Sequence, residues 1–233
     1  MSLAVASRAA GRAAHRSDAG GEQRRFVAYA AHELRTPLTT QRTLLELALA
    51  DRDADVACWR EIGQGVLDAC KQQERLVEAC LTLARSQSGA QRREPLDLAT
   101  LAADALAARD LRELELVLAL EPVSTIGDPE LLERLVSNLI SNAIRHNVAG
   151  GRIEVATRAR SGHAHLAVAN TGRPVPVADL SRLFQPFQRL APDGVGLGLA
   201  IVQAIADAHD ATVSARARPG GGLRIDVSFR LLD

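Results

Sequence analysis

The segment "DPELLERLVSNLISNAIRHN", residues 128–147, decides how the C-terminal half of the chain is built. Its apolar residues recur three and four apart, which predicts an amphipathic helix over about residues 129–146. The apolar face carries Leu132, Leu135, Leu139 and Ala143, and the polar face carries Arg134, Asn138, Ser141, Asn142 and Arg145. Two asparagines four residues apart beside an arginine offer oxygen ligands and a positive charge. The polar face is therefore a candidate for holding a metal ion and the phosphates that it bridges.

Strand-like segments surround this helix and predict a sheet. A strand is expected at 114–120, a hairpin at 152–160 and 165–170 turned by Ser161 and Gly162, and a second hairpin at 212–218 and 223–229 around "PGGG". Further helices are expected at about 98–109 and from a glycine-rich segment to about His209. Hairpins with helices between them indicate a mixed sheet covered by helices on one face, an α/β sandwich.

The N-terminal half has the pattern of two long helices, so the whole chain is of the α+β class. "DRDAD", residues 51–55, separates two apolar seams that alternate three and four residues apart. The first seam contains Val27, Ala31, Leu34, Leu38, Gln41, Leu45 and Ala48, and the second contains Trp59, Ile62, Val66, Ala69, Gln73, Leu76, Cys80 and Leu83. An antiparallel hairpin leaves half of each seam exposed, so we expect a homodimer with a four-helix bundle. The alternative is a hairpin packed on its own second domain.

The first seam contains "AAHELRTPL", residues 30–38, whose polar and charged side chains and proline are not needed for helix packing. At 100° per residue, His32 points roughly 130° away from the seam, so its imidazole should face solvent as a nucleophile. Thr36 lies one turn further on the same face, and Glu33 and Arg35 flank the histidine. Pro37 cannot donate to the carbonyl of Glu33, so a local bend is expected. Standing alone, the stretch is also compatible with an ordinary surface histidine.

"DGVGLGLAIVQAIADAH", residues 193–209, places Gly194, Gly196 and Gly198 before a strongly apolar helix. Exposed backbone N–H groups at a helix N-terminus can bind phosphate oxygens. The segment is not a Walker A loop, because no Lys-Ser/Thr pair follows it. It does not fit the dinucleotide fingerprint either, since the preceding "FQPFQRLAPD" is a loop rather than a strand.

Composition excludes several other classes of protein. The 28 basic and 28 acidic residues balance, which argues against nucleic acid as a partner. No apolar run approaches the roughly 20 residues of a membrane helix, so the chain as given is expected to be cytoplasmic. Cys58, Cys70 and Cys80 lack the spacing of metal ligands and are expected to be buried, reduced thiols.

In this order, five motifs resemble the catalytic core of sensor histidine kinases of bacterial two-component systems, over about residues 22–232. "HELRTPL" is similar to the phosphoacceptor box, "NLISNAIRH" to the N box, "NTG" to a variant first glycine box, "LFQPF" to the F box and "GVGLGLAIV" to the second glycine box. The resemblance implies a lead-in segment (1–21), a dimerisation and phosphotransfer hairpin (22–88), a linker (89–95) and a GHKL-type ATP-binding domain (96–233). It also implies that any membrane attachment lies in a sensor region absent from this chain.

For the hairpin, the resemblance implies that ATP phosphorylates His32 and that Glu33 orients the imidazole and accepts its proton. The phosphoryl group would then pass to an aspartate in the receiver domain of a response regulator. Thr36 occupies the position that similar kinases use to place the water that dephosphorylates this partner.

For the second domain, the resemblance implies a nucleotide site that uses Mg²⁺. Asn142 would bind the metal and Asn138 would support the phosphate and water network. Arg145 and His146 would lie near the nucleotide, and Phe184 and Phe187 would anchor a lid. The phosphates would be wrapped by Gly194, Gly196, Leu197 and Gly198.

The chain departs from the family at the adenine site. Asn170, followed by Thr171 and Gly172, stands where the family commonly has an aspartate; a neutral acceptor would weaken adenine binding by about 1 kcal/mol. The lid, residues 188–193, is also short. These departures leave open a degenerate kinase that acts mainly as a phosphatase or docking scaffold. A GHKL-type ATPase unrelated to signalling is a third possibility, against which the hairpin argues.

Overall fold

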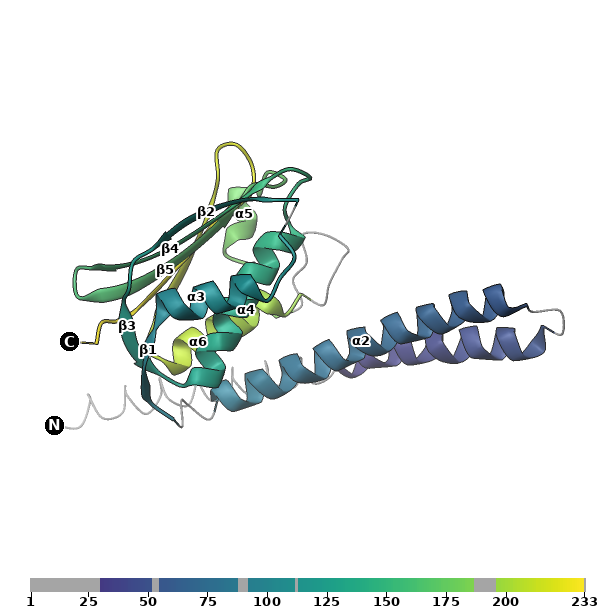
Figure 1. The fold of residues 1–233 in the computed structure, drawn as a ribbon. Helices are drawn as coiled ribbons and strands as arrows, with labels where there is room; N and C mark the ends of the chain where they lie inside the picture. Colours follow the sequence, from purple (N-terminus) through teal and green to yellow (C-terminus); the bar gives the residue numbers. More distant parts are fainter. Residues whose placement is uncertain (1–29, 52–54, 88–91, 112, 187–195, 233) are drawn as a thin grey trace. The chain divides into compact units, whose positions relative to one another are not determined.

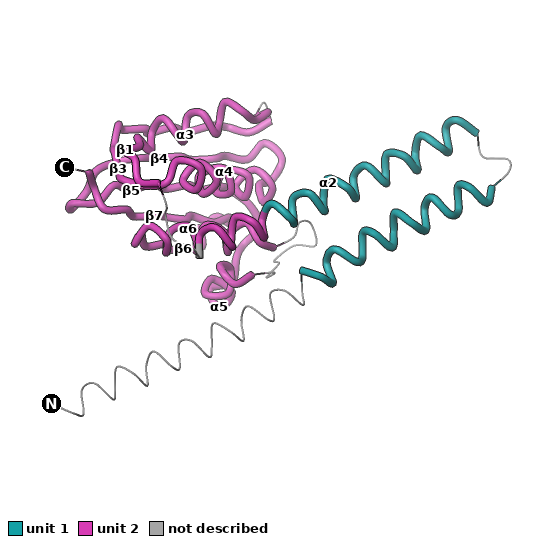
Figure 2. The backbone as a smooth tube through the Cα atoms, turned by 90° about the horizontal axis from the view of Figure 1, so that it is seen from below, with its two compact units in different colours: residues 1–78 teal, residues 79–233 magenta. Residues whose placement is uncertain are grey.

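The computed structural model describes residues 30–51, 55–87, 92–111, 113–186 and 196–232. Contacts divide the chain into two compact units, residues 1–78 and 79–233 (Figure 2). The described residues of the first unit are helical, and the second contains a sheet with helices, which confirms the α+β class.

The described helices of the N-terminal half form an antiparallel hairpin, as predicted. The first is described over residues 30–50, and the second, α2, runs from Val56 to Gln87, so its last nine residues belong to the second unit (Figure 1). Asp55 caps α2, because its Oδ1 accepts a hydrogen bond of 2.8 Å from the N–H of Cys58. No helix among the described residues combines the length and the hydropathy needed to cross a bilayer.

A polar layer joins the two helices of the hairpin. Gln41 Nε2 donates to Gln73 Oε1 at 3.1 Å and to Cys70 Sγ at 3.3 Å. Gln73 Nε2 also reaches the carbonyl of Leu34 at 3.4 Å. Hydrogen bonds of this kind favour one register between the helices over its neighbours.

The predicted seam is correct for most of α2 but partly wrong for the first helix. On α2 the seam residues from Ile62 to Leu83 are half-buried or buried, whereas Trp59 is 40% exposed. On the first helix Ala31, Leu38 and Leu45 are exposed instead of buried. The buried and half-buried positions lie on the neighbouring face, at Ala30, Leu34, Pro37, Gln41, Leu44 and Ala48. The apolar stripe is wider than one seam, and a single partner helix covers only one side of it.

The second unit contains a mixed five-stranded sheet with strand order β2-β4-β5-β7-β6. β2 is parallel to β4, and the other neighbours are antiparallel. The strands are β2 (Glu115–Leu120), β4 (Arg152–Arg160), β5 (His163–Asn170), β6 (Thr212–Ala217) and β7 (Leu223–Arg230). Ser161 and Gly162 have φ values of 51° and 73°, the left-handed conformation of a tight two-residue hairpin turn. The mixed sheet and this turn confirm the prediction.

Three helices cover one face of this sheet (Figure 1). They are α3 (Leu98–Ala107), α4 (Pro129–Arg145) and α6 (Gly198–Ala208), each within two residues of its expected range. Leu132, Leu135 and Leu139 of α4 are at most 1% exposed, so the predicted apolar face of α4 is confirmed. This face packs into the core between the helices and the sheet.

Three short elements were not predicted. β1 (Glu94–Asp97) pairs with β3 (Ser124–Gly127), and α5 (Val177–Leu180) is a single turn. The linker expected at 89–95 is wrong at its last two residues, because Glu94 and Pro95 pair with Gly127 and Ile126. Four-residue strands are too short to show a periodicity, and Pro95 argued against a strand.

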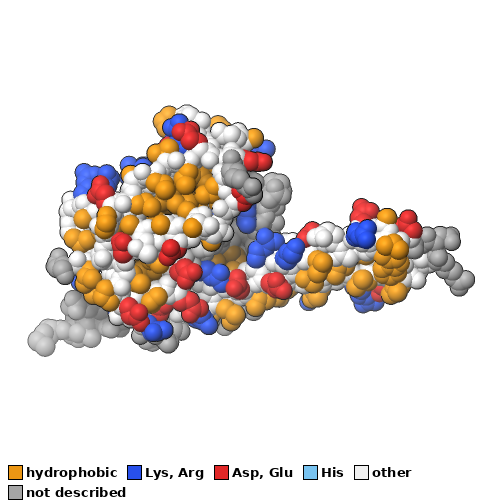
Figure 3. All heavy atoms as spheres, in the orientation of Figure 1, with side chains coloured by type: hydrophobic (Ala, Val, Ile, Leu, Met, Phe, Trp, Pro, Cys, Tyr) orange, Lys and Arg blue, Asp and Glu red, His pale blue; other side chains and the backbone are white. Residues whose placement is uncertain are grey.

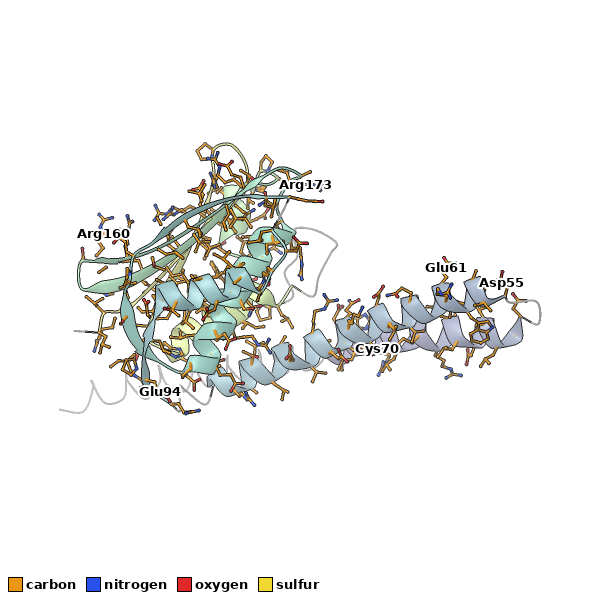
Figure 4. The ribbon with its side chains drawn as sticks, in the orientation of Figure 1. Asp55, Glu61, Cys70, Glu94, Arg160 and Arg173 are labelled. Carbon is orange, nitrogen blue, oxygen red and sulfur yellow. The ribbon has the colours of Figure 1, made fainter. Side chains whose placement is uncertain are left out.

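The three cysteines are half-buried rather than buried. Cys70 lies on α2 of the hairpin (Figure 4). Partial burial raises the pKa of the Cys80 thiol. The seam that was expected to bury Cys80 is only partly covered within one protomer.

Candidate functional site

His32 lies on the exposed side of the first hairpin helix, as predicted from its spacing to the seam. Thr36 is exposed one turn further along, and its hydroxyl donates to the carbonyl of His32 at 3.3 Å. Glu33 is half-buried, and Pro37 is buried. The helix therefore presents an accessible imidazole with a hydroxyl beside it.

A hollow of about 440 Å³ adjoins this histidine. The described residues that line it are His32, Arg35, Thr36, Thr39, Thr40, Thr43 and Leu44. The hydroxyls of Thr39 and Thr40 donate to the carbonyls four residues earlier, so their methyl groups are left to form the surface. The described lining therefore comes from the first helix alone.

The second set of candidate residues begins on α4. Asp128 caps this helix through its carboxylate, which accepts from the N–H groups of Glu130 and Leu131, and Pro129 follows at the first position. Asn138 and Asn142 are half-buried, and Asn138 Nδ2 is held by the carbonyl of Arg134 at 2.9 Å. Among the described residues, the Asn142 amide has no hydrogen-bond partner, so its oxygen is available to a ligand.

Ser141, predicted on the polar face with the two asparagines, is bonded to another part of the domain. Arg109, which follows α3, donates through Nη2 to Ser137 Oγ at 2.7 Å and to Ser141 Oγ at 2.9 Å. Partial burial lowers the pKa of this guanidinium. These bonds tie the segment after α3 to α4, a role that the sequence did not indicate because Arg109 precedes the two serines by 28 and 32 residues.

The glycine-rich segment approaches α4 closely where α6 begins. A Cβ on Gly198 would lie 3.6 Å from Asn138 Oδ1, so the first turn of α6 lies against the polar face of α4. Gly196 has a φ of 71°, a conformation that suits glycine, and Leu197 is buried as the residue that precedes α6. Gly194, Phe187 and the predicted lid at 188–193 lie outside the described residues.

Asn170 ends β5 and is only 4% exposed. Its Nδ2 donates to the carbonyls of Thr171 at 2.7 Å and His146 at 3.3 Å. Because both partners can only accept, the amide nitrogen must face them and the amide oxygen must face away. His146 is the C-cap of α4, so this bond joins the end of α4 to the loop after β5.

Glycines allow this loop to pass its neighbours. A Cβ on Gly172 would lie 2.4 Å from the carbonyl oxygen of His146. Gly222, in the turn between β6 and β7, has a φ of 94°, and a Cβ there would lie 2.0 Å from the carbonyl oxygen of Asn170. Only glycine fits at either position. The sequence analysis placed Gly172 in the nucleotide site, which stays a prediction, and Gly222 only in the turn of the second hairpin.

The second set of residues gathers at one end of the sandwich. Figure 4 places Arg173, which follows this loop, at the end opposite Arg160 and the β4–β5 turn. Hydrogen bonds and close approaches connect Asn138 with Gly198 and Asn170 with His146. Arg145 is exposed and Phe184 is half-buried. One end of the domain thus combines amide oxygens with the backbone N–H groups of a helix start, which suits a polar, phosphate-bearing ligand.

A metal at this end would have few protein ligands. In the described ranges, no group of three or more His, Cys, Asp and Glu side chains is arranged to hold an ion. The free oxygen of Asn142 suits Mg²⁺, which takes oxygen ligands and is commonly bound by one or two protein groups together with phosphates and water. The donor set therefore fits a metal that arrives with a nucleotide.

Comparison with known proteins agrees with both halves of this description. Residues 22–89 match the family described as His Kinase A (phospho-acceptor) domain, and residues 127–233 match the histidine kinase-, DNA gyrase B- and HSP90-like ATPases. The chain belongs to the sensor histidine kinases.

Curated members of this family match most of the chain. The sensor protein CutS of Streptomyces coelicolor is 43% identical over 218 residues, which cover 89% of this chain and 52% of CutS. The sensor protein kinase PmrB of Pseudomonas aeruginosa is 35% identical over 219 residues, covering 88% and 45%. The histidine kinase chain therefore spans about half the length of the curated relatives that it matches.

Solved structures of histidine kinases share the fold. That of Acinetobacter baumannii AdeS has a TM-score of 0.68 at 26% identity and covers 87% of this chain and 98% of its own. The histidine kinase ThkA, solved in complex with the response regulator protein TrrA, has a TM-score of 0.73 at 18% identity, covering 100% and 67%. At that identity, the likeness to ThkA supports the fold alone.

Proposed function

We propose that this chain is an ATP-dependent protein-histidine kinase that phosphorylates its own His32 and passes the phosphoryl group to an aspartate of a response-regulator receiver domain. The observation that carries the proposal is the exposed imidazole of His32 with Thr36 beside it. It occurs in a chain that also carries the amide and glycine residues of a nucleotide site.

In this proposal the nucleotide binds at the end of the sandwich that contains Asn138, Asn142 and Asn170. The outward oxygen of Asn170 accepts a hydrogen bond from the adenine amino group, and Gly172 lets the base approach. Arg145 and His146 lie beside the nucleotide, and Asn138 supports the phosphates. The phosphates meet the backbone of Gly194, Gly196, Leu197 and Gly198. Asn142 holds Mg²⁺, which when bound neutralises part of the phosphate charge.

The chemical step needs alignment and charge neutralisation more than covalent help from the protein. A ring nitrogen of His32 attacks the γ-phosphorus, an N–P bond forms, and the bond to the bridging oxygen breaks so that ADP leaves. The ring proton passes to Glu33. The phosphohistidine then donates its phosphoryl group to the partner's aspartate. In the separate dephosphorylation of that partner, Thr36 places the water that hydrolyses the aspartyl phosphate.

The hairpin also supports self-association. Leu38, Leu45 and Leu49 are exposed at spacings of seven and four residues on the first helix, and Val56 and Leu67 are exposed on α2. Figure 3 shows apolar side chains at the surface along the hairpin. Exposed apolar surface of this extent marks an interaction site. A second hairpin would cover these side chains in a four-helix bundle, so we infer a homodimer. We also infer that the chain acts on the cytoplasmic side, as part of a membrane-bound sensor.

Labelled ATP tests the proposal. Wild-type protein with γ-labelled ATP and Mg²⁺ is expected to take up acid-labile label, which His32→Gln should lose, and to pass it to a receiver domain. If wild type binds nucleotide but takes up no label, the chain is the degenerate scaffold that Asn170 and the short lid would allow. Hydrolysis of ATP without labelled protein would instead indicate a GHKL-type ATPase.

A further inference from the structure

His209 is a buried histidine outside the proposed reaction. It ends α6 as the C-cap, and its side chain is 8% exposed. Its Nδ1 lies 2.7 Å from the carbonyl oxygen of Ile205, and its Nε2 lies 2.9 Å from the backbone nitrogen of Asp128. One imidazole thus bridges the end of α6 and the residue that starts α4.

The partners of His209 fix its protonation. The N–H of Asp128 can only donate, so Nε2 must accept and carries no proton. The carbonyl of Ile205 can only accept, so Nδ1 must carry the proton. The Nδ1–H tautomer satisfies both bonds, and a side chain without an acceptor at the position of Nε2 would lose the bond to Asp128.

Two neighbours pack against the ring. A Cβ on Gly127 would lie 2.9 Å from His209 Cδ2, and Phe229 of β7 packs edge-on with ring centroids 6.5 Å apart. The carboxylate of Asp128 is engaged in capping α4, and that of Asp207 accepts from Gln203. Asp210, the next residue, has a φ of 53°.

This bridge lies one helix length away from the candidate nucleotide site. α4 runs ten residues from Asp128 to Asn138, about 15 Å, and α6 runs a similar distance back from Gly198 to His209. Both ends of α6 lie against α4: Gly198 lies beside Asn138 in the middle of α4, and His209 bonds to Asp128 at its start. A change in length at the His209 bridge would slide one helix along the other, and with it the two sides of the phosphate site.

We propose that His209 is a positioning residue for nucleotide binding: it sets the axial register of α4 against α6 and thereby the spacing between Asn138 and the glycine-rich start of α6. The inference rests on the proposed nucleotide site. It predicts that nucleotide binding depends on the hydrogen-bond acceptor at Nε2 of His209 and not on the bulk of the ring.

Two substitutions separate these roles. In His209→Gln the amide oxygen can reach the position of Nε2 and accept from Asp128, whereas in His209→Asn the shorter amide can replace only Nδ1. Calorimetric titration with a non-hydrolysable ATP analogue and Mg²⁺ is expected to show about tenfold weaker binding for His209→Asn and a loss below about threefold for His209→Gln. The matched controls His163→Asn and His163→Gln, at an exposed position of the β4–β5 hairpin, should bind like wild type.

Equal affinity of both His209 variants, once corrected for the folded fraction in thermal unfolding, would overturn the proposal. Binding by His209→Asn that matches wild type would do the same.

Hydrogen exchange without nucleotide distinguishes this inference from the proposed function. His209→Asn should speed amide exchange at Asp128 and at the contact between Asn138 and Gly198, and His209→Gln should do so much less. If wild type binds no ATP analogue, the proposed function fails, and exchange alone decides whether His209 sets the register. Unchanged exchange at both places in His209→Asn would refute it.

Discussion

The hairpin and the sandwich hold their candidate residues in opposite ways. His32 and Thr36 stand exposed on one side of a helix, and the hairpin's own contacts do not depend on the imidazole. Asn170 and Gly172 are instead enclosed, the first by two backbone carbonyls and the second by the end of α4. If these residues act as proposed, catalysis and stability depend on different residues in the hairpin, whereas nucleotide binding and folding share residues in the sandwich.

The largest expected effect separates the chemical roles of the two regions. His32→Gln should abolish labelling by ATP while nucleotide affinity and thermal unfolding stay as in wild type, because the ring is exposed. If the His32→Gln protein still takes up label, the claim that His32 carries the chemical step is wrong.

Asn142→Ala should abolish labelling by weakening Mg²⁺-dependent binding, which a titration with and without the metal would detect.

Core truncation should separate the two regions by stability. Leu135→Ala removes a fully buried side chain from α4 and is expected to cost about 2–5 kcal/mol of the unfolding free energy of the sandwich, measured by denaturant titration. Leu45→Ala on the hairpin removes a side chain that is 41% exposed in one protomer. Leu45→Ala should chiefly weaken self-association, which sedimentation would measure. If it lowered the stability of the sandwich as much as Leu135→Ala does, the two regions would not be separable by stability.

Asn170→Asp tests whether the sandwich tolerates the residue that the family commonly has. The resemblance alone predicts tighter adenine binding by the charged acceptor. The structure predicts the reverse, because a carboxylate would face the carbonyls of His146 and Thr171 that now accept from Nδ2. We expect roughly tenfold weaker binding of the ATP analogue, about 1.4 kcal/mol. Tighter binding with unchanged stability would show that the amide orientation does not matter.

The smallest expected effect concerns Asp97, which caps α3. Burial acts to raise the pKa of this carboxyl, but hydrogen bonds from the N–H of Val123, the Thr100 hydroxyl and the N–H of Ala99 outweigh it and lower the pKa. A lowered pKa stabilises the fold above the unfolded value and loses that effect as the pH falls through the folded value. Asp97→Ala should cost about 1 kcal/mol at neutral pH. Its difference from wild type should shrink below about pH 3.9, as unfolding curves at several pH values would show.

The same contrast explains what the sequence could predict. The faces of α4, the exposure of His32 and the Ser161–Gly162 turn follow from local periodicity and turn chemistry, so they were predictable. The orientation of Asn170, the Arg109 bridge and the His209 bridge depend on residues between 24 and 81 positions apart. Such pairs leave no periodic trace in a single sequence. The side of the first helix that packs was also missed, because its apolar stripe can serve two partners.

Locating the phosphoryl group tests the central claim most directly. Wild-type protein incubated with ATP and Mg²⁺, digested at neutral or alkaline pH and sequenced by mass spectrometry, should carry one phosphoryl group on the imidazole of His32. Phosphate on another residue, or none on a protein that demonstrably binds the nucleotide, would contradict the account.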